Sequence, residues 1–305
     1  MAQEILKFAE EYSMATDEVE ITFGEPLREH TSFRVGGNAQ IFVRPYSEEA
    51  LGAGLELCRR FGLKKHILGK GTNLLVSDKG VSGVVFDMTS LAGWQIEGQT
   101  LFARSGSLLK NLAKAAAEAS LSGLEFAHGI PGTLGGALYM NAGAYGGEMK
   151  DVVRQVYLMD PAGHPFELSG EEMEFAYRRS RMEGSEDIII GALLGLKPGD
   201  KEAIEALMRD LSQRRRDKQP LEYPSAGSTF KRPEGHFAGQ LIEESGLRGY
   251  RHNGAAVSEK HCGFIVNEGS ATASDIYALI QEVRTKVLEH TGVELTPEVK
   301  MWGSF

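Results

Sequence analysis

The stretch Gly129–Gly147 reads G-I-P-G-T-L-G-G-A-L-Y-M-N-A-G-A-Y-G-G, and seven of its nineteen residues are glycine. Average glycine usage of about 7 % would give one or two. Because glycine loses much conformational entropy on folding, this density needs a physical reason. Two reasons fit: the backbone passes through left-handed turns, or it lies against a flat or phosphorylated ligand. The apolar residues between the glycines argue against a loose linker, and a tight turn that leads into a buried helix remains the structural alternative.

The composition is that of a soluble globular protein with two domains or one large one. The chain has 305 residues, of which 42 % are hydrophobic and 25 % charged, and its formal net charge is −9. This charge disfavours nucleic acid or an anionic membrane as the main partner, so an anionic ligand must meet a local cluster of cations. The two cysteines lie far apart and the eight histidines show no metal-ligand spacing, which disfavours a disulfide framework and a metal site. Without a signal peptide or a membrane-spanning apolar run, we expect a cytoplasmic protein.

Hydrophobic periodicity predicts a chain in which strands alternate with helices. Helices are expected over 2–13, 48–61, 107–120, 202–218, 237–245 and 275–291, and strands over 39–44, 81–87, 100–104, 152–160, 187–194 and 263–267. Ser47 is the expected N-cap of the second helix and Gly62 its expected end. Residues 20–200 therefore indicate an α+β region, and residues 219–224 a linker.

A second glycine-bearing turn lies within His66–Asp78, which reads H-I-L-G-K-G-T-N-L-L-V-S-D. A short apolar strand enters the turn Gly69–Leu74, and another strand leaves it. Successive backbone N–H groups in such a turn can form an anion-binding nest. The spacing matches neither a nucleoside-triphosphate loop nor a Rossmann fingerprint. On these residues alone the turn is either a plain hairpin or a phosphate cradle.

Two arginine-rich runs supply candidate cations. In Phe175–Met182 three arginines fall within four residues beside Tyr177. This run is either a solvated basic loop or a site that binds a carboxylate through paired hydrogen bonds. The run Arg214–Lys218 closes a predicted helix, where cations also stabilise the helix dipole.

Seven stretches in a fixed order carry a family resemblance. They are HTSFRVGG from His30, GKGTNLL from Gly69, GIPGTLGGA from Gly129, NAGAYG from Asn141, YRRS from Tyr177, SAGSTFK from Ser225 and LTPEV from Leu295. Together they resemble the UDP-N-acetylenolpyruvoylglucosamine reductase family of flavoenzymes in bacterial peptidoglycan synthesis. The resemblance runs from about residue 20 to the C-terminus.

The resemblance implies an α+β fold with an FAD-binding domain of the vanillyl-alcohol-oxidase (PCMH) type, in two subdomains, and a C-terminal α+β substrate-binding domain. The implied domains are 1–30 as an N-terminal helix and lead-in, 31–200 as the FAD-binding domain with a subdomain boundary near 85, and 201–305 as the substrate-binding domain. It also implies non-covalent FAD and NADPH as co-substrate. No covalent flavin attachment is expected, and His128 and His261 are expected to be structural.

The resemblance assigns residues to each ligand. FAD contacts fall on Gly69, Lys70, Gly71, Thr72, Asn73, Leu74, Gly129, Ile130, Pro131, Gly132, Thr133, Gly136, Ala137, Asn141, Gly143, Ala144 and Arg215. Substrate contacts fall on Tyr145, Tyr177, Lys218, Lys231 and Arg232. Glycines along a flavin avoid the collision that a Cβ atom would make with the ring or the phosphates.

The implied activity is the reduction of the enolpyruvyl ether UDP-N-acetylglucosamine enolpyruvate to the lactyl ether UDP-N-acetylmuramate. NADPH passes hydride to the flavin N5, the nicotinamide leaves, and hydride then moves from N5 to the terminal carbon of the substrate. The resemblance makes Arg178 the guanidinium that stabilises charge on the substrate carboxylate, with Glu298 assisting at the same centre. It makes Ser228 the proton donor to the carbon that bears the ether oxygen. Since serine is far weaker than an ideal acid near neutral pH, the acceptor carbon must be strongly basic and cations such as Lys231 or Arg178 must lie near.

The chain departs from one branch of the family. It has no room for that branch's tyrosine-bearing loop between Tyr177 and the 202–218 helix, so it resembles the other branch. Lys300 stands where the first branch has arginine, and Arg232 where it has asparagine, which leaves the residues that hold the UDP open. Two alternatives are an FAD oxidase of the same fold that acts on an alcohol, and a flavin- or UDP-sugar-binding regulator without turnover. The three catalytic residues together favour the reductase, acting as a monomer on small molecules.

Overall fold

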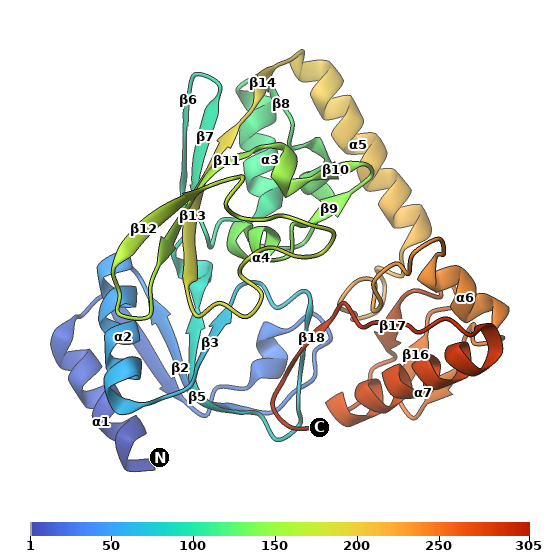
Figure 1. Ribbon diagram of the computed structural model, residues 1–305, viewed down its shortest axis with the longest axis horizontal. Coiled ribbons are helices and arrows are strands. Elements are labelled where there is room, and N and C mark those ends of the chain that lie inside the picture. Colours follow the sequence, from blue (N-terminus) through green and yellow to red (C-terminus); the bar gives the residue numbers. More distant parts are fainter. Residues whose placement is uncertain (1) are drawn as a thin grey trace. The chain divides into compact units, whose positions relative to one another are not determined.

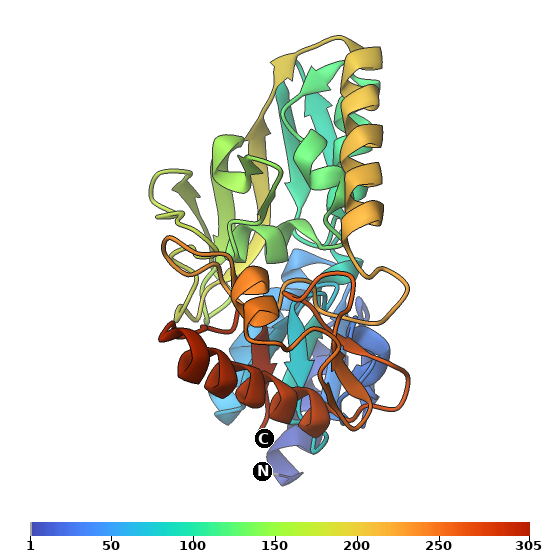
Figure 2. The same ribbon diagram turned by 90° about the vertical axis from the view of Figure 1, so that its right-hand side faces the viewer.

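The computed structural model describes residues 2–305 (Figures 1 and 2). The chain divides into two compact units. Unit 1 contains the described residues up to 23, residues 41–70 and residues 83–214, and unit 2 contains residues 24–40, 71–82 and 215–305. The chain therefore passes between the units five times.

The first part of unit 1 is a four-stranded sheet with two helices packed on it (Figure 1). The sheet has the order β1 (Val19–Phe23), β2 (Ala39–Pro45), β5 (Val81–Asp87), β3 (Lys65–Leu68), and the helices are α1 (Ala2–Ala15) and α2 (Glu48–Phe61). Phe8 and Tyr12 of α1 and Leu51 of α2 are fully buried against Ile41 and Phe86 of the sheet. Each helix thus buries one apolar face, as its periodicity predicts.

The ends of α2 follow directly from the sequence. The Ser47 Oγ accepts a hydrogen bond from the Ala50 N–H at 3.1 Å, and Gly62 ends the helix at φ 62°. A residue with a Cβ atom adopts that left-handed conformation only at a cost, which explains glycine there. Both predicted caps are confirmed.

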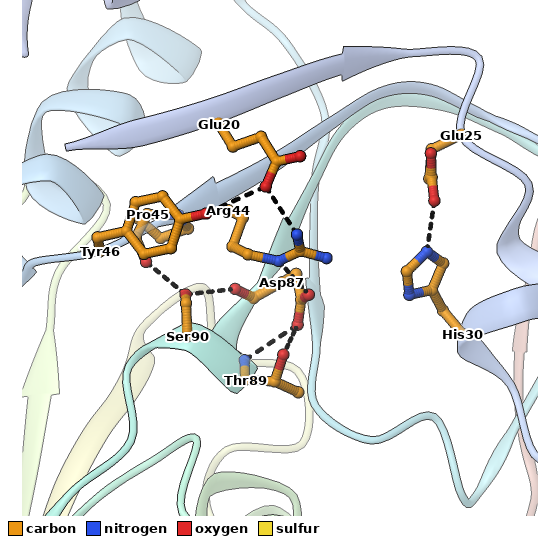
Figure 3. Close-up of polar contacts among 9 residues, drawn as sticks. All are labelled: Glu20, Glu25, His30, Arg44, Pro45, Tyr46, Asp87, Thr89 and Ser90. Atoms are coloured by element: carbon orange, nitrogen blue, oxygen red, sulfur yellow. Dashed lines mark hydrogen bonds and ion pairs between the residues drawn. The ribbon is translucent and has the colours of Figure 1, made fainter. Parts of the chain in front are cut away.

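An ionic network joins β1, β2 and β5 (Figure 3). The Arg44 Nε donates to the Asp87 Oδ2 at 3.0 Å and its Nη1 to the Glu20 Oε2 at 2.7 Å, while Asp87 also accepts from the Thr89 N–H at 3.0 Å. Burial disfavours the charged guanidinium, but the hydrogen bonds and charges of Asp87 and Glu20 outweigh it and raise the pKa of Arg44. The Asp87 carboxylate, 3 % exposed, is therefore paired, as a buried charge must be.

The second part of unit 1 is a five-stranded antiparallel sheet with helices on it (Figure 1). Its order is β12 (Pro165–Ser169), β11 (Val153–Met159), β13 (Ile188–Gly195), β7 (Thr100–Arg104), β6 (Trp94–Glu97). The helices are α3 (Leu109–Glu118), α4 (Leu134–Tyr139) and most of α5 (Lys201–Lys218). Leu112 of α3, Leu138 of α4 and Ile204 of α5 share one core with Val156 and Leu194 of the sheet.

Short elements complete unit 1. They are the 3-10 helices η2 (Met88–Ser90), η3 (Glu125–Gly129) and η4 (Met149–Asp151) and the strands β8 (Leu121–Ser122), β14 (Lys197–Pro198), β9 (Gly143–Ala144) and β10 (Gly147–Glu148). The strands form two antiparallel pairs, β8 with β14 and β9 with β10.

Unit 2 is built on its long C-terminal helix. It contains η1 (Leu27–His30), β4 (Leu74–Val76), α6 (Ala238–Glu244), the antiparallel strands β15 (Arg251–His252), β16 (Ala255–Val257) and β17 (Ile265–Asn267), α7 (Ala273–Thr291) and β18 (Lys300–Trp302). Ile276, Leu279 and Val283 of α7 are fully buried in one core with Phe33 and Leu75. In this unit the His30 Nε2 also lies 2.8 Å from the Glu25 Oε1 (Figure 3).

The division into units differs from a division at residues 30 and 200. Residues 71–82 belong with the C-terminal part because β4 pairs in parallel with β18, with Leu74 opposite Lys300. Residues 201–214 belong with unit 1 because Ile204 and Met208 of α5 are buried in its core. The pairing of β4 with β18 joins residues more than two hundred positions apart, so it leaves no local pattern in the sequence.

Within residues 2–305, no helix is long and apolar enough to cross a membrane. The described residues also contain no cluster of three or more histidine, cysteine, aspartate or glutamate side chains that could hold a metal ion.

Candidate functional site

The turn that leads from β3 to β4 presents unpaired backbone donors. Throughout residues 2–305, no acceptor takes a hydrogen bond from the N–H groups of Lys70, Gly71, Thr72 or Asn73. Gly71 is buried at φ 62°, and a Cβ atom on it would overlap the His30 carbonyl oxygen. Buried backbone N–H groups are nearly always paired, and successive free ones bind anions. The turn therefore fits a phosphate better than it fits a plain hairpin.

The stretch Gly129–Gly147 contains a turn that leads into a buried helix, and it also contains a glycine in a left-handed turn. The 3-10 helix η3 runs into a turn and then into the short helix α4, whose Leu134 and Leu138 are fully buried. At three positions the surrounding protein, without any ligand, explains why the residue is glycine. A Cβ atom on Gly147 would lie 2.7 Å from the Phe126 ring, one on Gly143 would lie 2.7 Å from the Gly147 carbonyl oxygen, and Gly146 has φ 92°.

Gly136 has no such explanation within the protein. It is exposed, and a Cβ atom on it would meet only the Thr133 Oγ1, at 3.6 Å. Within residues 2–305, the N–H groups of Gly132, Thr133 and Gly136 donate no hydrogen bond to any protein acceptor. Glycine inside a helix costs stability relative to alanine, so an open glycine with free donors fits a ligand that lies against the backbone. The observed donors and open backbone thus fit the expected flavin nucleotide.

The two glycine-bearing segments meet within unit 1. A Cβ atom on Gly69 would overlap the Oγ1 of Thr133, a residue that is 2 % exposed. This close approach brings the start of the phosphate-type turn to the N-terminal end of α4. The sequence predicts Gly69 and Thr133 as cofactor contacts, and within unit 1 these two residues lie side by side.

Asn141 holds the end of the glycine stretch in place. Its Nδ2 donates to the Glu148 Oε2 at 2.6 Å and to the Ala176 carbonyl at 3.0 Å, and its Oδ1 accepts from the Lys150 N–H at 3.0 Å. The residue is fully buried and its φ is 42°. The side chain that the sequence predicts as an FAD contact is therefore engaged with protein groups.

Arg178 lies against the same stretch. Its Nη2 donates to the Gly143 carbonyl at 3.0 Å, and its guanidinium lies 5.1 Å from the centre of the Tyr177 ring. Its backbone has φ 53°, which is uncommon for a residue with a Cβ atom. The arginine is held from two sides, as a group that must meet an anion in a fixed geometry would be.

In unit 2 the segments that carry Ser228 and Glu298 are bonded to each other. The Glu298 N–H donates to the Thr229 carbonyl at 2.8 Å, and Ser228 forms an isolated β-bridge with Phe264. Thr229 is fully buried, and its Oγ1 accepts from the Ile265 N–H at 3.0 Å, while Ser228 is exposed. The buried threonine thus anchors the segment from which the serine hydroxyl is presented.

His261 lies close to the serine, a proximity that spacing does not reveal. Its Nδ1 accepts from the Gly263 N–H at 3.1 Å, and a Cβ atom on Gly263 would lie 3.1 Å from that Nδ1 and 3.4 Å from the Ser228 Oγ. Burial lowers the pKa of His261, and the positive charges of Arg248 and Lys218 lower it further, against an opposing backbone hydrogen bond. The imidazole is therefore neutral at neutral pH, with its remaining proton on Nε2.

The other predicted contacts have varied surroundings. Tyr145 and Tyr177 are 46 % and 50 % exposed, and Lys218 is exposed at the end of α5. The Lys231 N–H donates to the Thr296 carbonyl at 2.8 Å. Arg232 lies 3.8 Å from the centre of the Phe237 ring and donates to the His236 carbonyl, so it is engaged within its own loop.

Several predicted cofactor residues contribute backbone or packing. Ala137 is buried in the unit 1 core and Ile130 packs on that core. Leu74 is buried at the start of β4, and the Arg215 Nε donates to the Gln219 Oε1 at 2.8 Å. Gly129, Ala144 and Pro131 are half-buried or exposed along the glycine stretch.

Known proteins match this chain over most of its length. Residues 219–302 match the UDP-N-acetylenolpyruvoylglucosamine reductase C-terminal domain, and residues 39–169 match an FAD binding domain. The chain is 52 % identical over 285 residues to UDP-N-acetylenolpyruvoylglucosamine reductase of Clostridioides difficile (strain 630), which covers 93 % of this chain and 94 % of that protein. The chain belongs to the UDP-N-acetylenolpyruvoylglucosamine reductase family.

Solved structures agree with membership of the UDP-N-acetylenolpyruvoylglucosamine reductase family. The crystal structure of UDP-N-acetylenolpyruvylglucosamine reductase from Thermus caldophilus has a TM-score of 0.80 at 36 % identity, covering 93 % of this chain and 99 % of that one. A variant of Phl p 4, a glucose oxidase, has a TM-score of 0.50 at 16 % identity over 64 % of this chain and 44 % of its own. The second similarity concerns the fold alone. The predicted reductase family and the FAD-binding α+β fold are confirmed.

Sequence reasoning assigns no role to Thr229 and expects His261 to be structural. Thr229 stands beside the predicted proton donor, but a buried threonine has no distinguishing spacing. His261 has a weak signal in the sequence, since it lies two residues before Gly263 in the turn that leads to β17. Only the isolated bridge between Ser228 and Phe264 shows that the histidine lies near the serine segment.

Proposed function

We propose that this chain reduces UDP-N-acetylglucosamine enolpyruvate to UDP-N-acetylmuramate, with FAD as a non-covalent cofactor and NADPH as co-substrate. Its membership of the reductase family and its FAD-binding domain support this assignment. The observation that carries it furthest is the bond between the Glu298 N–H and the Thr229 carbonyl, because it couples the segments of the proposed proton donor and the proposed carboxylate.

The cofactor is proposed to rest on backbone donors. The free N–H groups of residues 70–73 suit the pyrophosphate, and the open backbone at Gly136 suits a flat ring. When bound, FAD supplies the two-electron chemistry that connects NADPH to the substrate. Asn141 is proposed to shape this cradle rather than to touch the cofactor, because its amide is engaged with protein groups.

Arg178 is proposed to pair with the carboxylate of the enolpyruvyl group. As the terminal methylene carbon gains a hydride, electrons move onto that carboxylate, and a fixed guanidinium stabilises the charge as it develops. The bond to the Gly143 carbonyl and the contact with the Tyr177 ring fix the guanidinium before the charge appears. Glu298 is proposed to assist at the same centre.

Ser228 is proposed to protonate the carbon that bears the ether oxygen. The substrate then gains one hydride and one proton, its C=C bond becomes a C–C bond, and the serine recovers its proton from water. The hydroxyl is exposed while its neighbour Thr229 is anchored, which suits a donor that must reach a bound substrate. Tyr145, Tyr177, Lys218 and Lys231 are proposed to contact the substrate, and Arg232 only if its contact with Phe237 opens.

An anaerobic experiment in two stages tests this proposal. NADPH should bleach the flavin of the wild-type protein, and the enolpyruvyl substrate should restore its colour. Ser228→Ala should bleach normally and recover at least ~100-fold more slowly, which is the usual size of acid–base catalysis. Ser225→Ala, the same truncation three residues earlier, should recover normally. Unchanged recovery in Ser228→Ala would remove the serine from the reaction, and no recovery in the wild type would remove the substrate.

We also infer that the chain works as a monomer in the cytoplasm, on small molecules and not on nucleic acid or membranes. The net charge of −9 supports the exclusion of polyanions. Light scattering coupled to size exclusion should give the mass of one chain, and the mass of two chains would contradict the monomer.

A further inference from the structure

Within unit 2 the backbone of Glu298 is held on both of its polar sides. Its N–H donates to the Thr229 carbonyl at 2.8 Å, and its carbonyl accepts from the Asn73 Nδ2 at 3.2 Å. The first bond leads to the segment of Ser228. The second leads to the turn whose free N–H groups fit a phosphate.

Asn73 is itself fixed in that turn. Its carbonyl accepts from the Lys300 N–H at 3.0 Å, so its backbone and its side chain hold the chain on either side of Val299. The next residue, Leu74, begins the parallel pairing of β4 with β18. Asp78 closes the other end of the same segment by accepting from the Ala273 and Ser274 N–H groups, each at 2.8 Å. A side chain on so constrained a backbone can place its partner accurately.

We propose that Asn73 is a positioning residue whose side-chain amide holds Glu298 for the protonation half of the reaction. This inference rests on the proposed function for the name of that reaction. The amide hydrogen goes to the Glu298 carbonyl, while the donors of the turn that suit a phosphate are backbone groups. Loss of the side chain therefore leaves the phosphate donors in place and releases the peptide that carries the carboxylate.

The consequence is a selective defect. A misplacement of about 1 Å at a reacting group can cost ~10²-fold in rate. Since Glu298 is proposed to act on the enolpyruvyl substrate, reduction of the flavin by NADPH should be spared. Reoxidation by the enolpyruvyl substrate should be slowed, because the carboxylate is then out of place.

The test compares Asn73→Ala, which removes the amide without adding a charge to the turn, with Ser32→Ala. The Ser32 Oγ donates to the Gly71 carbonyl of the same turn at 3.5 Å and has no bond to Glu298, so it is a matched control. Stopped-flow absorbance measures the two half-reactions separately, and fluorescence titration of the apoprotein measures the FAD dissociation constant. Asn73→Ala should slow reoxidation at least ~10-fold and leave flavin reduction and FAD affinity within ~3-fold of wild type. Ser32→Ala should leave all three within ~3-fold.

A double-mutant cycle separates positioning from general damage. Glu298→Ala should slow reoxidation by itself, and adding Asn73→Ala should slow it no further, since the amide acts through the glutamate. If the double variant slows reoxidation by the product of the two single effects, the proposal is overturned. A weaker FAD affinity together with slower flavin reduction would also overturn it, because Asn73 would then bind the cofactor directly.

Hydrogen exchange in the apoprotein tests, without any reaction, the clamp that the Asn73 side chain forms on the Glu298 carbonyl. The peptide that carries residues 298–300 should exchange faster in Asn73→Ala than in wild type or Ser32→Ala, because the bonds that protect it are weakened. Unchanged exchange would overturn the clamp. Wild-type protein whose reduced flavin is not reoxidised by the enolpyruvyl substrate would contradict the proposed function instead, and the exchange result would still decide the role of Asn73.

Discussion

At the scale of single residues, a substitution at Gly136 should affect protein stability and cofactor affinity differently. Gly136→Ala should leave the apoprotein equally stable or more stable by about 0.5–1 kcal/mol, since alanine favours a helix and only the Thr133 Oγ1 lies near, at 3.6 Å. FAD affinity should fall ~10-fold or more, because a methyl group would hold the flavin away from the backbone. Urea unfolding of the apoprotein and FAD titration measure the two effects.

Gly147→Ala is the matched control at the other end of the stretch. Its added Cβ atom would lie 2.7 Å from the Phe126 ring, so the apoprotein itself should lose about 1–3 kcal/mol through overpacking. If Gly136→Ala instead keeps wild-type FAD affinity, the cofactor does not approach the backbone at that point.

The buried thiol of Cys58 should make stability fall in alkali. Burial raises the pKa of Cys58 to about 12, slightly opposed by the charge of Lys65, whereas an unfolded thiol ionises near pH 8.5. The folded pKa is the higher one, so the stabilising contribution is complete below about pH 8.5 and is lost as the pH rises towards 12. Urea midpoints should therefore fall over that range, less steeply in Cys58→Ala. A thiol reagent at pH 8 should label neither buried cysteine until urea unfolds the chain.

At the scale of elements, Asp78 provides an N-terminal cap for a helix far away in the sequence. Its two carboxylate oxygens accept from the Ala273 and Ser274 N–H groups at the start of α7. Asp78→Ala should reduce the free energy of unfolding by about 1–2 kcal/mol, as the loss of a charged cap does, and Asp78→Asn by less. Urea denaturation measures both. Equal stability in all three proteins would mean that Thr272 and Asp275, which form the local capping box, suffice.

The elements that local chemistry defines were predictable, and those that depend on distant partners were not. The strand Val81–Asp87 and the helix Lys201–Lys218 match their predicted ranges within one residue, because the sequence marks the ends of each. The three-residue strands β16 and β18 are too short for a pattern and exist through their pairing with β17 and β4. The helix α4 was only one of two alternatives, since its glycines favour no helix by themselves.

At the scale of the whole molecule, the candidate site could be named from motifs but not assembled from them. The order of seven motifs identifies the family, and it assigns Ser228 and Glu298 as predictions. The bond through Thr229 and the clamp of Asn73 on Glu298 join residues up to 225 positions apart, and no local spacing encodes such contacts. Sequence therefore predicts which side chains are needed, while tertiary pairing decides which residues hold them.

The same long-range pairing predicts that the C-terminal domain does not fold alone. Residues 219–302 match a family domain, yet the core of unit 2 also contains Phe33, Val35 and Leu75, which are at most 5 % exposed. A fragment of residues 215–305 would lose these side chains and the β4 partner of β18. Since burying one such side chain contributes about 1.5–3 kcal/mol and a domain is stable by only about 5–15 kcal/mol, the fragment should lack a cooperative urea transition and near-ultraviolet circular dichroism. In the intact chain Leu75→Ala should cost about 2–5 kcal/mol. A fragment that unfolds cooperatively would show instead that residues 24–40 and 71–82 only cover a core that is already complete.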